Sequence, residues 1–187
     1  ADVATALNGT GSTDTYSFPY ITLDSSNYIW TSARFYNGTN RYPVALDTVQ
    51  TGDTDPSTWT FNSSTILTTA TPDSTKYAVI TRRTNQDMYA VIVSNTTVFG
   101  CLWDDDHAGG GRWENTADAS CASASNTDSI GTKLYGMRGN HSAVVDATNN
   151  RVHLTYINSS GNVIFDQYDG TNWSFSDVTL DSASDNM

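Results

Sequence analysis

The stretch 142–174 constrains the fold most strongly, because it reads as four short strands joined by three tight turns. Within it, residues 151–158 alternate and place Val152, Leu154 and Tyr156 on one face of a strand. The turns consist of Asn, Asp, Ser, Thr and Gly, which favour turn geometry. Short connections join antiparallel neighbours, so this stretch predicts a four-stranded antiparallel meander.

Two upstream segments repeat its order of turn, strand, turn, strand, variable loop and tryptophan. The expected strands are 28–35 and 41–47 before Trp59, and 88–94 and 98–103 before Trp113. A repeat with a period of this length fixes the architecture of a chain. We therefore predict a single all-β domain over residues 1–187, with antiparallel four-stranded meanders in the approximate units 18–67, 76–116 and 134–180.

Charge and composition narrow the classes of function. The formal net charge is −11, with 20 acidic residues against 9 lysines and arginines. This balance argues against a nucleic-acid partner, which requires a basic surface, and against binding an anionic membrane through a basic patch. No run of apolar residues is long enough to predict membrane insertion.

Cysteines and glycosylation motifs both indicate a secreted or cell-surface protein. Cys101 and Cys121 are the only two cysteines, and they bracket a polar, glycine-rich loop, so we expect a disulfide between them. The N-x-S/T motif of N-glycosylation is a further feature of secreted chains. It occurs at Asn8, Asn37, Asn62, Asn95, Asn140, Asn158 and Asn172.

The predicted units resemble the blades of a β-propeller of the broad sialidase-like class, whose Asp-box (BNR-type) blades end in a G-x-x-W element. The matching residues run from Gly170 to Trp173. The Asp-box itself is S-x-D-x-G-x-x-W, whereas here Asp169 adjoins Gly170 and no serine stands two residues before it. The resemblance therefore concerns architecture and implies blades around a common axis.

Three units are fewer than the four to eight blades of a propeller. We therefore expect a partial or shared propeller, completed by another chain as a homo-oligomer or by more of a larger chain. Exposed sheet edges at the two ends of such a stack need covering, which also favours self-association. The alternative fold is a β-sandwich.

The most distinctive candidate site is the loop between Trp103 and Trp113. Three successive aspartates followed by glycines predict a calcium site, because oxygen ligands suit this cation; the proposed ligands are Asp104, Asp105 and Asp106. The alternative is a solvated acidic loop held by the disulfide. As a ligand-binding loop it offers two aromatic rings for stacking on sugars, with Trp103, Trp113, Arg112 and His107 as the binding residues.

Two classes of function follow from these observations. The first is a non-catalytic extracellular module for glycan recognition or self-assembly, with a carbohydrate or another protein chain as its partner. The second is a fragment or subunit of a carbohydrate-active hydrolase, which requires two positioned carboxylates. Its candidates are Asp104, Asp105, Asp106, Asp146 and Asp166, and their spacing selects no pair. We expect the first class, with no catalytic residue assigned.

Overall fold

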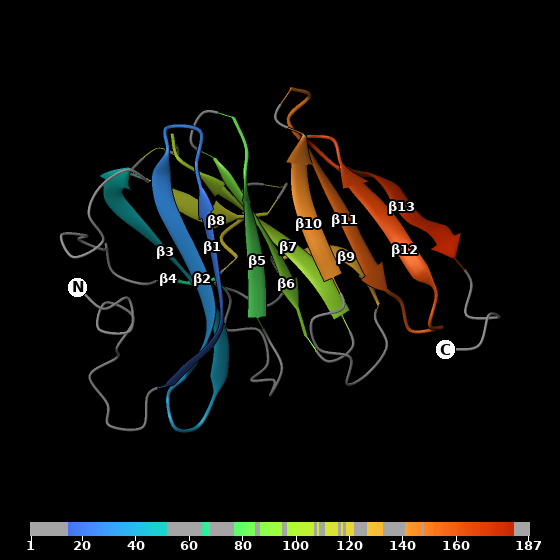
Figure 1. Ribbon diagram of the computed structural model, residues 1–187, viewed down its shortest axis with the longest axis horizontal. Coiled ribbons are helices and arrows are strands. Elements are labelled where there is room, and N and C mark those ends of the chain that lie inside the picture. The colour runs from blue at the N-terminus through green and yellow to red at the C-terminus, as the bar shows by residue number, and fades with distance from the viewer. Residues whose placement is uncertain are drawn as a thin grey trace.

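The chain is all-β, as the sequence predicts, and its described residues contain no helix. The computed structural model describes residues 15–51, 65–67, 77–84, 87–94, 97–106, 108, 111–115, 117, 119–121, 127–132, 141–146 and 148–181. Within these residues, thirteen strands form three antiparallel sheets that follow one another in chain order (Figure 1).

The first sheet has the order β1-β2-β3-β4. Its strands are β1 (Thr15–Leu23), β2 (Tyr28–Tyr36), β3 (Arg41–Thr51) and β4 (Thr65–Ile66). The expected strands 28–35 and 41–47 correspond to β2 and β3, and β3 continues further than predicted. Trp59, which was expected to mark the last strand of this unit, lies outside the described residues.

The second sheet contains β5 (Tyr77–Arg82), β6 (Met88–Val93), β7 (Thr97–Asp104), β8 (Arg112–Glu114) and β9 (Asp128–Thr132). The strands β8 and β9 share one edge of β7, where residues 102–104 pair with β8 and residues 97–100 pair with β9. The sequence did not predict β9. Gly131 allows this strand to approach the third sheet, since a methyl group there would overlap with the Tyr156 hydroxyl.

The third sheet has the order β10-β11-β12-β13. It consists of β10 (His141–Asp146), β11 (Arg151–Ile157), β12 (Val163–Tyr168) and β13 (Trp173–Asp181). The predicted alternation on β11 is confirmed, because Val152, Leu154 and Tyr156 are buried and the residues between them are half-buried.

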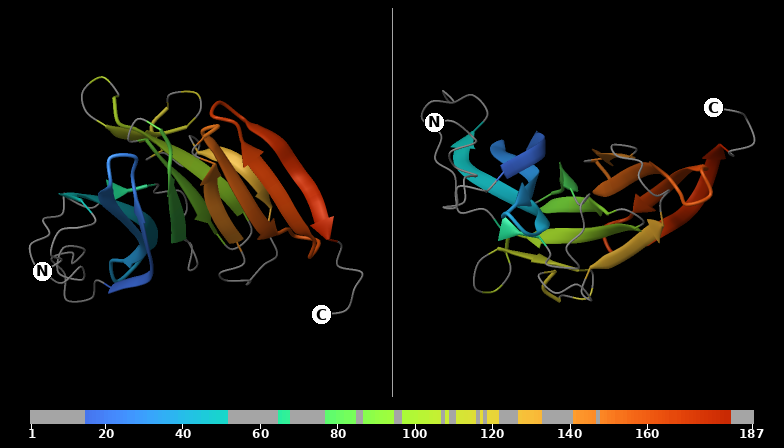
Figure 2. Two further views of the ribbon diagram at one scale, coloured as in Figure 1. Left: turned by 45° about the horizontal axis from the view of Figure 1, so that its top comes forward. Right: turned by 90° about the horizontal axis from the view of Figure 1, so that it is seen from below.

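The three sheets stack face to face, with the second sheet between the other two (Figures 1 and 2). One face of β6 contributes Met88, Ala90 and Ile92 to a cluster that includes Trp30 of the first sheet. The other face contributes Tyr89, Val91 and Val93 to a cluster with the third sheet. Both faces of β6 are therefore covered, and all six of its residues are buried.

A hydrogen-bonded aromatic network joins the second and third sheets. The fully buried Tyr89 hydroxyl donates to Asp128 Oδ2 over 3.0 Å and accepts from Trp173 Nε1 over 3.0 Å. Tyr168 packs on the Tyr89 ring with 4.7 Å between centroids, and the Arg83 guanidinium lies 5.2 Å from the Tyr168 centroid. Burial raises the pKa of Tyr89 well above its ordinary value, and it raises that of Tyr168 to about 12.

Most of the tight turns are closed by an Asp or Asn side chain that accepts backbone N–H groups. Asp24 Oδ1 accepts from Ser26 N and Tyr28 N, at 2.8 and 2.9 Å. These bonds satisfy donors that have no ladder partner, which is why Asx residues favour turns. The residues that do the same in other turns are Asn37, Asp104, Asn115, Asp146, Asn158 and Asp169.

The arrangement agrees with three successive meanders, but the described strands do not close into a ring or a barrel. The first strands of the sheets, β1, β5 and β10, lie side by side at the centre of the stack (Figure 1). No described segment forms a helix long and apolar enough to cross a membrane.

Candidate functional site

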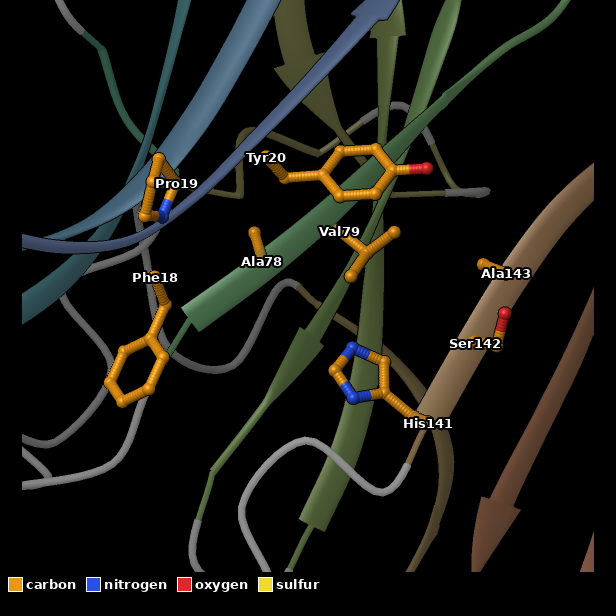
Figure 3. Close-up of a pocket in the computed structure, with 8 residues that line it drawn as sticks. All are labelled: Phe18, Pro19, Tyr20, Ala78, Val79, His141, Ser142 and Ala143. Carbon is orange, nitrogen blue, oxygen red and sulfur yellow. The ribbon is translucent and has the colours of Figure 1, made fainter.

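A pocket of about 290 Å³ lies where the first strands of the three sheets meet. Figure 3 shows the eight residues that line it, with Tyr20 above Val79 and the His141 ring extending from β10 toward β5. The lining residues are Phe18, Pro19, Tyr20, Ala78, Val79, His141, Ser142 and Ala143. Each sheet therefore contributes its first strand to this site.

A bulge in β1 presents two aromatic rings at the pocket. The pairing register of β1 with β2 shifts between Ser17 and Tyr20, and Phe18 has a φ of 56°. A positive φ is unusual for a bulky residue and costs conformational energy. The Arg34 guanidinium lies 4.7 Å from the Phe18 ring centroid, and Arg34 Nε donates to Ser17 Oγ over 2.9 Å. These contacts hold the bulge, which leaves Phe18 39% and Tyr20 37% exposed.

The chemistry of the lining suits non-covalent binding. Phe18 and Tyr20 offer aromatic rings, and the Tyr20 and Ser142 hydroxyls can donate or accept hydrogen bonds. The His141 ring lines the pocket, but its Nε2 atom is buried. A mostly apolar pocket with a few polar groups is the usual form of a small-molecule site. None of the eight residues lining this described pocket is a carboxylate, so the pocket contains no acid pair of the kind glycoside hydrolysis uses.

The predicted ligand-binding tryptophans lie in a packed cluster instead of an open platform. Trp103 on β7 lies opposite Trp113 on β8, with 5.7 Å between the ring centroids. Trp30 contacts both rings edge-on, with centroid distances of 5.4 Å to Trp103 and 6.1 Å to Trp113. Trp113 is 4% exposed and Trp103 is half-buried. Trp113 thus offers no open ring face, because its indole fills the core between the first two sheets.

Gly111 of the glycine-rich loop lies too close to the Trp103 ring for any side chain. A methyl group at this position would stand 2.6 Å from Trp103 Cε2 and overlap with the neighbouring ring carbon. A glycine is therefore needed for the loop to cross the indole so closely.

The predicted metal ligands have local hydrogen-bonding partners. Asp104 Oδ1 accepts from Asp106 N over 3.2 Å, and Trp103 Nε1 donates to Asp105 Oδ1 over 3.4 Å. Asp105 N donates to Asp87 Oδ1 over 3.3 Å. Within the described part of the chain, no three His, Cys, Asp or Glu side chains are arranged to hold a metal ion. The calcium prediction stays a prediction, and His107 lies outside the described residues.

Asp87 is the carboxylate most affected by this loop. Burial raises its pKa above the ordinary value, and the charges of Asp104 and Asp106 add to the increase. The hydrogen bond from Asp105 N and the positive charge of Arg83 act in the opposite direction. Burial of Asp87 is thus the main cause of its raised pKa, and the neighbouring aspartates of the loop add to it.

Arg112 pairs with the lone glutamate. Its Nη2 lies 2.7 Å from Glu114 Oε2, and its Nε donates to the same oxygen over 3.2 Å. Glu114 is buried. The guanidinium is thus committed at least in part to this pair, which lies within β8 and neutralises the buried carboxylate.

The predicted disulfide is confirmed. Cys101 on β7 is bonded to Cys121, 20 residues later, with 6.3 Å between their Cα atoms. Both cysteines are fully buried beside Trp113. The bond therefore anchors the loop that follows β8 to the central sheet, and it is consistent with an extracellular protein.

The candidate aspartates for hydrolysis do not share a site. Asp146 closes the turn between β10 and β11 through bonds to Thr148 N and Asn149 N, and the Asn149 amide holds its pKa below the ordinary value. Asp166 is fully buried on the face of β12 that packs against the second sheet. None of the five candidate aspartates is among the described residues that line the pocket.

Three of the glycosylation motifs fall on described residues. Asn37 and Asn172 are exposed, and Asn158 is half-buried. The Asn37 and Asn158 side chains accept backbone hydrogen bonds through Oδ1, so the Nδ2 atom that carries an N-glycan is not used in these bonds. Asn8, Asn62, Asn95 and Asn140 lie outside the described residues.

Comparison of the chain with protein-family models, curated proteins and solved structures finds no match. The residues of the pocket therefore have to be judged on their geometry alone. The sequence analysis did not single them out, although the first predicted unit was expected to begin at residue 18. The available signal was positional, since a propeller-like arrangement brings the first strand of every unit toward one axis.

Proposed function

We propose that this protein is a non-catalytic binding module whose sheets are arranged like the blades of a β-propeller, and that the pocket between β1, β5 and β10 is its ligand site. The observation that carries this proposal is the convergence of three first strands on a pocket lined by aromatic rings, an imidazole and a hydroxyl. The disulfide and the exposed motifs at Asn37 and Asn172 support a secreted, glycosylated protein.

The ligand we propose is a neutral sugar. Sugar rings combine an apolar face, which stacks on an aromatic side chain, with hydroxyl groups that exchange hydrogen bonds. The pocket offers Phe18 and Tyr20 for the first purpose and the Tyr20 and Ser142 hydroxyls for the second. Its volume of about 290 Å³ is at the lower end of ligand pockets, so one sugar ring is the expected occupant. The net charge of −11 disfavours an acidic sugar.

The test is a titration with methyl glycosides of neutral hexoses and 6-deoxyhexoses, followed by saturation-transfer NMR and calorimetry. We expect weak, saturable binding by the wild-type protein, and its loss in Tyr20→Ala. Ile21→Ser is the matched control, because Ile21 is the next residue of β1, points to the opposite face and is 61% exposed. Equal binding by Tyr20→Ala and Ile21→Ser, or no binding of any sugar by the wild type, would refute the proposal.

A further inference from the structure

Among the described residues, no further sheet packs against the outer face of the third sheet. Residues 29–33 of β2 and all of β6 are buried on both sides, whereas β11 is buried on alternate residues only. The exposed fractions of Val144, Val163 and Val178 on this outer face are 61%, 36% and 41%. Among the described sheets, this is the face that has no layer packed against it.

The residues of this face form one continuous surface. In the pairing register, Val144 lies opposite His153, Ile157 opposite Val163, and Phe165 opposite Val178. His153 and Phe165 are in ring contact, with 5.5 Å between their centroids. We call this surface the outer face, and it consists of Ser142, Val144, His153, Thr155, Ile157, Val163, Phe165, Gln167 and Val178. Gln167, opposite His153, is the buried member of this set.

The outer face is poor in charge although the chain is strongly acidic. The charged side chains described on this side of the sheet lie at its ends, where Asp146 is opposite Arg151 and Asp181 is opposite Val163. The middle of the face carries aliphatic, aromatic and neutral polar groups. Depletion of charge at the centre is typical of protein interfaces, and it lets two molecules of charge −11 meet without opposing carboxylates in the contact.

The stacking inside the chain indicates what kind of layer fits there. The opposite face of the same sheet presents Val152, Leu154, Tyr156 and Ile164 to the second sheet, so face-to-face packing of sheets already builds this molecule. A further sheet on the outer face would continue that packing. The far side of the first sheet does not supply it, because Ile29, Ala33 and Val44 are already buried there.

We propose that the outer face binds the same face of a second copy of this chain, as an isologous two-fold dimer with six stacked sheets. In a two-fold contact both partners use the same surface patch, so one exposed face on each chain is sufficient for a closed dimer. The proposal rests on the stacked, propeller-like architecture and does not depend on sugar binding in the pocket.

The size of the face indicates a weak dimer. Four strands spaced about 4.8 Å apart, each with about six residues rising about 3.3 Å, cover roughly 400 Å². A standard interface buries about 800 Å² per partner. We therefore expect a dimer that forms at high protein concentration and dissociates on dilution.

The test is sedimentation velocity and light scattering over a wide range of protein concentration. The wild-type mass should rise from monomer to dimer, and Val144→Glu should remain monomeric at every concentration. The matched control is Ile21→Glu, because Ile21 is also 61% exposed but lies on the first sheet. Both positions are exposed, so both variants should fold, which circular dichroism and melting temperature will check.

A wild type that stays monomeric at all concentrations would overturn the proposal, and so would a dimer that Val144→Glu leaves intact or that Ile21→Glu disrupts equally. Sugar titration of the monomeric Val144→Glu variant separates this proposal from the preceding one. Sugar binding by that monomer would uphold the pocket without bearing on the interface. Dimerisation of a wild type that binds no sugar would uphold the interface alone.

Discussion

Replacing Gly100 by alanine should destabilise the protein strongly, although it adds a single methyl group. Gly100 lies on β7 beneath the Tyr89 ring, and a methyl group there would overlap with the Tyr89 hydroxyl and stand 2.7 Å from Cε1 and Cζ. Tyr89 is fully buried, and the rings of Tyr168 and Trp173 lie 4.7 and 5.8 Å away. The tyrosine therefore has no free space into which it can move.

The expected magnitude follows from two costs. Overpacking of a core by a methyl group costs about 1–3 kcal/mol. If the methyl group displaces the Tyr89 ring, the hydroxyl keeps at most one of its hydrogen bonds to Asp128 and Trp173. Losing the bond to the Asp128 carboxylate costs about 1.5–3 kcal/mol, and losing the bond from Trp173 costs about 0.5–1.5 kcal/mol. With one bond lost, we expect a total loss of about 2–6 kcal/mol in the free energy of unfolding. For a chain of this length, that lowers the melting temperature by roughly 10 °C.

Urea unfolding followed by circular dichroism measures this loss, and a double-mutant cycle with Tyr89→Phe identifies its cause. Tyr89→Phe alone loses both hydrogen bonds but creates no overlap. In the double variant the hydroxyl that meets the new methyl group is absent, so its loss should be clearly smaller than the sum of the two single losses. A loss below about 1 kcal/mol for Gly100→Ala, or strict additivity, would refute the packing argument.

The disulfide closes a separation of 20 residues, so Cys101→Ala/Cys121→Ala should lower the free energy of unfolding by about 3 kcal/mol. A reductant should produce a similar loss in the wild type and none in the variant; a wild type indifferent to reductant would contradict this. The pKa of Tyr168 is raised to about 12 because burial favours the neutral phenol. Its contribution to stability is therefore complete below pH 10, the ordinary pKa, and is lost as the pH rises toward 12. Melting temperatures should fall less steeply above pH 10 in Tyr168→Phe than in the wild type, and identical slopes would count against a titrating Tyr168.

Local rules predicted the strands of this fold better than they predicted its packing. Alternation identified both faces of β11, because one face is buried and the other is not. The same rule gave no information on β6, whose residues are all buried between two sheets. The faces that meet are chosen by tertiary contacts between distant residues, such as Ser32 Oγ donating to Ala78 O over 2.8 Å. The pocket depends on those contacts, so it could not be derived from any one segment.

The difference between the predicted and the observed surroundings of Trp103 and Trp113 has a similar cause. Sequence position alone shows that Trp103 and Trp113 flank a loop, and such rings suit a sugar platform or a core equally well. The deciding partner is Trp30, which comes from another sheet and meets both rings edge-on. Its own indole donates to Asp24 Oδ2 over 3.2 Å, so the cluster is also tied to the first turn. An aromatic residue far away in the chain thus helps to bury Trp113, while Trp103 stays half-buried beside it and its predicted binding role stays a prediction.

Part of the acidic character of the chain lies in its turns, where Asp24, Asp104, Asp146 and Asp169 accept backbone N–H groups. Each meander needs a tight connection after nearly every strand, and an Asp or Asn side chain closes most of them by accepting backbone N–H groups. Asp104 performs this task within the run that predicted a calcium site, as Asp24 and Asp169 do elsewhere. A run of aspartates in a meander is therefore weak evidence for a cation. The charge-poor outer face is more informative, because the turns place carboxylates around it and the alternation of the strands keeps them out of its centre.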